Sequence, residues 1–134
     1  MTRRRFTVEQ ADRTLPLVRR IVQDIVDGYG RWQALVRDFE LATASSTAES
    51  PDADADRLQR EAQRLAVDIE GFVGELEQLG VEFKGYEDGL VDFPSEANGR
   101  PIYLCWRLGE PAVQYWHEVN AGVAGRQSLR RLVA

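Results

Sequence analysis

The feature that most constrains this chain is an unbroken spacing of apolar residues through its first third. From Val8 to Phe39, apolar residues recur at intervals of alternately three and four positions. This period of 3.5 residues aligns them in one stripe along a helix, as in the seam of a coiled coil. Thr7 followed by Gln10 forms a capping-box pattern at the start of the stripe. We therefore predict a long helix over residues 8–41.

A second seam with the same spacing runs from Leu58 to Leu79. Its start is marked by a proline that suits a first helical turn and by aspartates that favour the positive end of the helix dipole. Gly80 follows the last seam residue and is a natural C-terminal stop. The sequence predicts a second helix that begins at Pro51 or Asp54 and ends at Leu79.

The segment 43–52 between the two seams is small, polar and interrupted by proline, which is typical of a connector. Two matching seams joined by a short connector predict an antiparallel helical hairpin over residues 7–79. The apolar stripe of the first helix is wider than one partner helix covers. The C-terminal third, a second copy of the chain or both must cover the rest, and we expect a homodimer.

The period changes at Val81, where short β-rich segments replace the helical seams. The segments 81–86, 90–94 and 102–107 are separated by Asp88-Gly89 and Asn98-Gly99, and both dipeptides are strong hairpin signals. We predict a three-stranded antiparallel β-meander.

Centring the second hairpin on Asn98-Gly99 fixes the facing of its strands, because side chains alternate across a strand. An apolar face then packs on the helices and contains Val91, Phe93, Ile102, Leu104 and Trp106. The opposite face contains Asp92, Tyr103, Cys105 and Arg107, with Asp92 directly opposite Cys105. Centring the first hairpin on Asp88-Gly89 places Gly85 beside Asp92.

A third helix is expected to begin at Pro111 and to end at Gly122. The fold class is therefore α+β, with a long antiparallel helical hairpin, a small three-stranded antiparallel β-meander and a short third helix. We expect one domain over residues 1–134, with the meander and third helix at 80–122 and a basic tail at 123–134.

Charge and composition exclude several classes of protein. The net charge is −5, and residues 43–99 hold 14 acidic and 4 basic residues, which disfavours a nucleic-acid partner. A single cysteine excludes an intrachain disulfide, and no apolar run is long enough to cross a membrane. We expect a cytoplasmic protein without a membrane partner. Walker, GxGxxG and GxSxG motifs are absent from the sequence, which disfavours nucleotide-cradling and α/β-hydrolase chemistry.

Several runs of the sequence together resemble a bacterial family of unknown function, DUF2203. They are Phe6-Thr-Val-Glu-Gln-Ala-Asp-Arg-Thr-Leu-Pro16, Gly89-Leu-Val-Asp-Phe-Pro94, Tyr103-Leu-Cys-Trp-Arg-Leu-Gly-Glu110, Tyr115-Trp-His-Glu118 and Gly122-Val-Ala-Gly-Arg-Gln127. The resemblance covers essentially the whole chain apart from the connector at 43–56. It implies one domain type and no particular activity.

The C-terminal third also carries the residues that are suited to chemistry. His117 and Glu118 are candidate acid–base catalysts. His117, Asp92 and Cys105 are candidate ligands of one divalent metal ion, provided that the fold brings them together. The alternative for His117 is a partly buried histidine that is hydrogen-bonded to a neighbour.

A small anionic ligand is the other candidate for this region, because arginine can clamp a carboxylate or phosphate. The candidate ligand-binding residues are Asp92, Tyr103, Trp106, Arg107, Glu110, Trp116 and Arg126. Packing is the alternative role of the two tryptophans, and pairing with local acids is the alternative for the two arginines.

Two functional hypotheses follow. In the first, a compact polar site in the C-terminal third binds a small anionic ligand or a metal ion, with catalysis left open. In the second, the protein is a non-enzymatic scaffold or interaction module that acts through its long helices.

Overall fold

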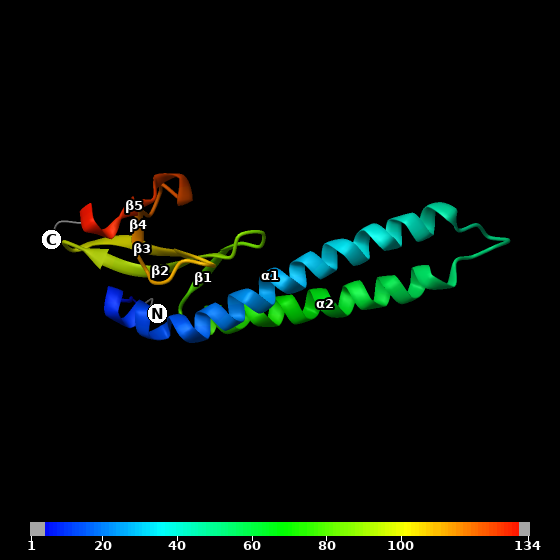
Figure 1. Cartoon of the computed structure of the whole chain (residues 1–134), viewed down its shortest axis with the longest axis horizontal. Coiled ribbons are helices and arrows are strands. Elements are labelled where there is room, and N and C mark those ends of the chain that lie inside the picture. Colours follow the sequence, from blue (N-terminus) through cyan, green and yellow to red (C-terminus); the bar gives the residue numbers. More distant parts are fainter. Residues whose placement is uncertain (1–4, 132–134) are drawn as a thin grey trace.

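A long helical hairpin with a sheet at one end makes up the computed structural model, which describes residues 5–131 (Figure 1). The helices are α1 (Val8–Ser45) and α2 (Ala53–Gln78), which run side by side in opposite directions. The α+β class and the helical hairpin are confirmed. Residues 1–4 and 132–134, which include the end of the predicted basic tail, lie outside the described residues.

The hairpin begins and ends with the capping signals that the sequence predicts. Thr7 Oγ1 accepts the Gln10 N–H at 3.1 Å, and Gln10 Oε1 accepts the Thr7 N–H at 3.0 Å. These bonds satisfy two of the free N–H groups at the start of α1. At the end of α2, Gly80 adopts a φ of 87°. This left-handed conformation reverses the chain toward the sheet.

The close packing of α1 on α2 explains a glycine within a helix. Gly28 is buried, and a Cβ atom there would lie 3.2 Å from Ile69 Cγ1. A Cβ at this position would require the Ile69 side chain to shift by a few tenths of an ångström. Beyond this crossing, the outer part of the hairpin extends away from the sheet (Figure 1).

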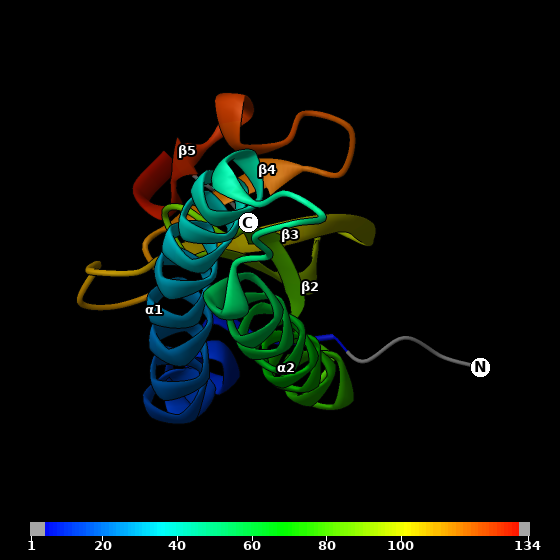
Figure 2. The ribbon, with the colours of Figure 1, turned by 90° about the vertical axis from the view of Figure 1, so that its right-hand side faces the viewer.

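Within residues 5–131, the sheet has five antiparallel strands in sequential order, two more than predicted. The strands are β1 (Glu82–Gly85), β2 (Leu90–Ala97), β3 (Arg100–Arg107), β4 (Tyr115–Glu118) and β5 (Gln127–Ser128). Two 3₁₀ turns, η1 (Val123–Gly125) and η2 (Leu129–Arg131), flank β5. Figure 2 looks along the hairpin from its tip, with the sheet behind the helices.

The register predicted for the second hairpin is confirmed. Asp92 pairs with Cys105, with Val91–Trp106 and Phe93–Leu104 on either side. Asn98 and Gly99 form the turn with φ values of 52° and 79°, as a two-residue hairpin loop with the twist of its strands requires.

The predicted third helix is wrong, because Tyr115–Glu118 forms β4 against the free edge of β3. Pro111 and Gly122 have the spacing of helix boundaries, but the residues between them follow another pattern. Trp116 faces the helices, while its neighbours Tyr115 and His117 pair with Cys105 and Tyr103 on the opposite face. This alternation is that of a strand.

The predicted register of the first hairpin is also wrong. Gly85 pairs with Leu90, and Glu82 instead of Gly85 lies opposite Asp92. The loop is longer than the Asp88-Gly89 dipeptide, since the Gly89 N–H bonds the carbonyl of Gly85 at 3.0 Å. The structure therefore places a second carboxylate beside Asp92, where Gly85 was predicted.

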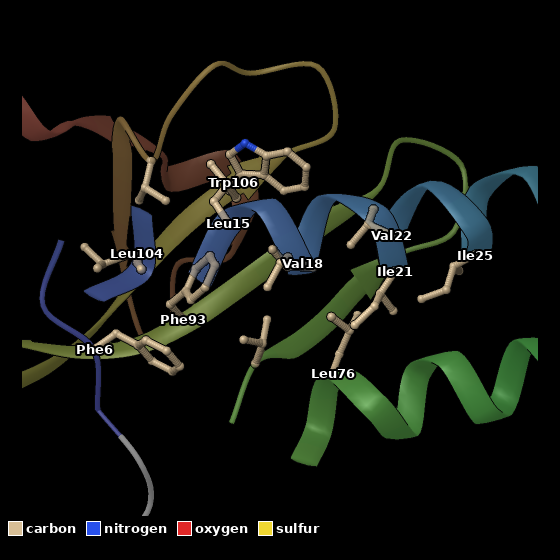
Figure 3. Close-up of a cluster of buried hydrophobic side chains, with 14 of the residues drawn as sticks. Phe6, Leu15, Val18, Ile21, Val22, Ile25, Leu76, Phe93, Leu104 and Trp106 are labelled. Atoms are coloured by element: carbon tan, nitrogen blue, oxygen red, sulfur yellow. The ribbon is translucent and has the colours of Figure 1, made fainter. Parts of the chain in front are cut away.

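The core lies between α1 and the helix-facing side of the sheet (Figure 3). Phe93, Leu104 and Trp106 pack there against Leu15 and Val18, as the predicted apolar face requires. Among the described residues, no helix has the length and apolar character needed to cross a membrane.

We predict that Gly89→Ala destabilises the protein by about 2–4 kcal/mol. Gly89 has a φ of 69°, and a Cβ there would lie 2.8 Å from both Val22 Cγ1 and Leu108 Cβ, which adds overpacking to backbone strain. Gly99→Ala is the matched control, because its φ is 79° with nothing within 4 Å. The control should lose only about 1 kcal/mol, measured by urea unfolding. Equal losses of stability in the two variants would contradict the close packing of the loop before β2 on α1.

Candidate functional site

Three strands bring one carboxylate, one thiol and one imidazole together. Asp92 lies on β2, Cys105 on β3 and His117 on β4. One ligand-type atom from each lies within 4.8 Å of the other two. The residues are 3%, 0% and 2% exposed. We call this group the Asp–Cys–His cluster. It contains the three residues that the sequence predicts as metal ligands.

The strongest contact in the cluster joins Asp92 to His117. Nε2 of His117 lies 2.9 Å from Oδ1 of Asp92, and Nδ1 lies 2.8 Å from the carbonyl oxygen of Glu118. Because a carbonyl only accepts, Nδ1 must carry a proton. One further proton must then lie between Nε2 and Oδ1, on either the imidazole or the carboxyl group. Loss of that single proton would leave one lone pair on His117 Nε2 and one on Asp92 Oδ1, both directed at the position between the two atoms.

Cys105 completes the cluster as an uncharged thiol. Burial raises its pKa to about 12, and the negative charge of Asp92 contributes in the same direction. A thiol of this kind is not a nucleophile at neutral pH, since thiolate is the reactive form. Coordination of its sulfur to a metal ion would still displace the thiol proton into solution.

Arg126 lies beside the cluster, although it follows in the chain after β4. Its Nη2 donates to Oε1 of Glu110 at 2.6 Å, and its guanidinium carbon lies 4.1 Å from the centre of the Tyr115 ring. The guanidinium also interacts with Cys105, where its charge lowers the pKa of the thiol against the larger effect of burial. Arg126 and Glu110 therefore form a partly buried ion pair at one side of the cluster.

A second polar group lies on the β1 side of the cluster. Tyr103 donates its hydroxyl proton to Oε2 of Glu82 at 2.9 Å, and Lys84 Nζ lies 3.1 Å from Oε1 of Glu82. The Tyr103 ring is 5.4 Å from the imidazole of His117. Glu82, Lys84 and Tyr115 are not among the site residues predicted from the sequence. Their positions depend on the four-residue loop before Leu90 and on the strand alternation of β4.

A family model described as "Uncharacterized conserved protein (DUF2203)" matches residues 4–129. The chain belongs to the DUF2203 family. The match covers both helices and all five strands, so every residue of the cluster lies within the family domain. No curated protein and no solved structure matches the chain significantly.

The remaining candidate residues of this DUF2203 chain lie away from the cluster. Glu118 faces outward and pairs with Arg100 at 2.7 Å. Trp106 and Trp116 belong to the core between sheet and helices. Arg107 lies at the end of β3, where its Nε is 3.4 Å from Asp88. The structure therefore brings together Asp92, Cys105, His117, Tyr103, Glu110 and Arg126, and it leaves these four outside.

In chelator-treated protein, we predict that His117→Ala lowers the free energy of unfolding by about 3–5 kcal/mol, because it leaves the buried Asp92 carboxyl group without its partner. The measurement is urea unfolding at neutral pH. Glu118→Ala is the control from the adjacent position, and it should cost far less, since solvent screens its ion pair with Arg100. Similar losses of unfolding free energy in both variants would show that the Asp92–His117 contact stabilises the protein no more than the exposed Arg100–Glu118 ion pair does.

Proposed function

We propose that the protein binds one divalent metal ion, of the Zn²⁺ type, through Asp92, Cys105 and His117. The observation that carries this proposal is the convergence of three different ligand groups in a buried place. A carboxylate, a thiolate and an imidazole are the three side-chain ligand types of zinc. Softer ligands such as thiolate also disfavour Mg²⁺ and Ca²⁺, which prefer oxygen.

The arrangement of the ligand atoms supports this proposal. Zinc bonds of about 2.0–2.3 Å place tetrahedral ligand atoms about 3.5 Å apart. The Nε2–Oδ1 separation of 2.9 Å and the 4.8 Å limit for the whole cluster lie on either side of that value. An ion bound between Nε2 and Oδ1 would require these two atoms to move apart by about 0.6 Å.

The hydrogen bond at the other ring nitrogen of His117 is one that metal-binding histidines usually make. Metal-binding histidines usually donate their other ring N–H to a carbonyl or carboxylate, which fixes the ring and its tautomer. The Nδ1 contact with the carbonyl of Glu118 at 2.8 Å does this here. It leaves Nε2 as the atom that faces the cluster.

Three protein ligands leave one coordination position for a molecule from solution, which is the arrangement of catalytic zinc sites. We therefore include catalysis at the bound ion in the proposal. A thiolate ligand also requires a reduced cysteine, and this favours the cytoplasm as the compartment in which the site works.

We predict that the chelator-treated protein takes up one Zn²⁺ or Co²⁺ per chain. Cobalt bound to a thiolate should add a charge-transfer band in the near ultraviolet, and Cys105→Ser should remove it. His117→Gln and Asp92→Asn should weaken binding at least tenfold, because each removes one ligand. The matched control is Asp88→Asn, an exposed aspartate on the neighbouring loop, which should bind as the wild type does.

Metal affinity should also rise with pH. Binding must displace the proton of the Cys105 thiol, whose pKa is raised to about 12, and the proton that lies between Asp92 and His117. Calorimetry in two buffers of different ionisation enthalpy should detect about two protons released per ion. No uptake of either metal, or uptake that is unchanged in all three ligand variants, would refute the proposal.

A scaffold function is the second candidate, and the outer part of the hairpin favours it. Within the described chain, no α1 residue beyond Trp32 belongs to the sheet-covered core. The exposed Leu41 and Val67, at 71% and 66%, lie on this hairpin. We propose that a second copy of the chain covers the helices.

Light scattering tests this second candidate. We expect twice the chain mass of 15.2 kDa, and Val67→Glu should shift the protein toward the monomer because it places a charge in the contact. Lys84→Glu changes a charge on β1, away from the hairpin, and should leave the mass unchanged. A wild-type monomer at high concentration would contradict the homodimer.

A further inference from the structure

Arg126 lies close to the metal ligands and on the same side of the sheet. It directly follows η1 and directly precedes β5, and its side chain is 14% exposed. The Tyr115 ring below its guanidinium belongs to the residue that pairs with Cys105 across β3 and β4. This pairing puts the guanidinium on the face that carries the Asp–Cys–His cluster.

One hydrogen-bond donor of the Arg126 guanidinium has no acceptor within residues 5–131. Nη2 is bonded to Glu110, but Nε is buried and has no hydrogen-bond partner among residues 5–131. Buried donors without an acceptor are rare and unfavourable. Arginine presents its donors as a planar fork that fits the two oxygens of a carboxylate. The free Nε–H therefore marks a place for a further oxygen atom.

Glu110 shows which kind of group this arginine binds. Its Oε1 accepts from Arg126 at 2.6 Å and also from the backbone N–H of Arg107 at 2.7 Å. A divalent ion with one carboxylate and one thiolate ligand carries no net charge. Arg126 adds a positive charge on the same face of the sheet, and its guanidinium interacts with Cys105 as well as with Glu110. Glu110 balances that charge as long as the Arg126–Glu110 ion pair is made.

We propose that Arg126 and the metal ion together bind a small carboxylate from solution, and that Glu110 is its internal competitor. The inference rests on the proposed metal binding. One carboxylate oxygen would take the open position of the ion, and the other would accept from Arg126. Charge-assisted bonds of this kind are stronger than neutral ones.

Acetate titrated into protein loaded with one Co²⁺ tests this inference, at constant ionic strength. The visible bands of cobalt report its ligands, and we expect a saturable change. Arg126→Gln should raise the Kd for acetate at least tenfold while one cobalt still binds. Glu110→Gln should lower that Kd several-fold, because the neutral amide competes less and can still accept the Arg107 N–H.

Two controls keep the result interpretable. Arg130→Gln changes an exposed arginine of the same segment and should behave as the wild type. Arg126→Lys keeps the charge without the fork and should give an intermediate Kd, even if Arg126→Gln unfolds. Failure to bind cobalt would refute the metal proposal itself. Normal cobalt uptake with no acetate response, or with the same Kd in the wild type and Arg126→Lys, would overturn only the carboxylate site.

Discussion

The buried contact between Asp92 and His117 sets a condition that the rest of the sheet has to meet. A carboxyl group and an imidazole that are 3% and 2% exposed are stable only if each is hydrogen-bonded. They lie on β2 and β4, so the contact spans the strand between them. A slip of one residue in either pairing would turn one partner into the apolar core. The geometry of the cluster therefore requires this register of the sheet and no other.

Much of this arrangement can be predicted from the sequence because it depends on local signals. The apolar spacing of the first 80 residues defines the hairpin, and Thr7 and Gly80 mark its ends. Asn98-Gly99 imposes a two-residue turn, which fixes the pairing of Asp92 with Cys105. Strand alternation then separates the apolar from the polar face. Two of the three cluster residues follow from these rules alone.

The position of the third residue is not encoded locally. His117 lies in a run of four strand residues, which is too short to show a clear period, and the flanking Pro111 and Gly122 suggest a helix. The run becomes a strand because the free edge of β3 offers it hydrogen bonds. Arg126 and Glu82 reach the cluster through a 3₁₀ turn and a four-residue loop. Packing of Gly89 against Val22 and Leu108, which no local pattern reveals, accompanies that loop.

The most direct test of the account is a crystal structure of the zinc-loaded protein with anomalous diffraction at the zinc edge. We expect one strong peak within bonding distance of Cys105 Sγ, His117 Nε2 and a carboxylate oxygen of Asp92. A peak only at surface carboxylates, with the Asp92–His117 hydrogen bond intact, would contradict the proposal that Asp92, Cys105 and His117 bind a metal ion.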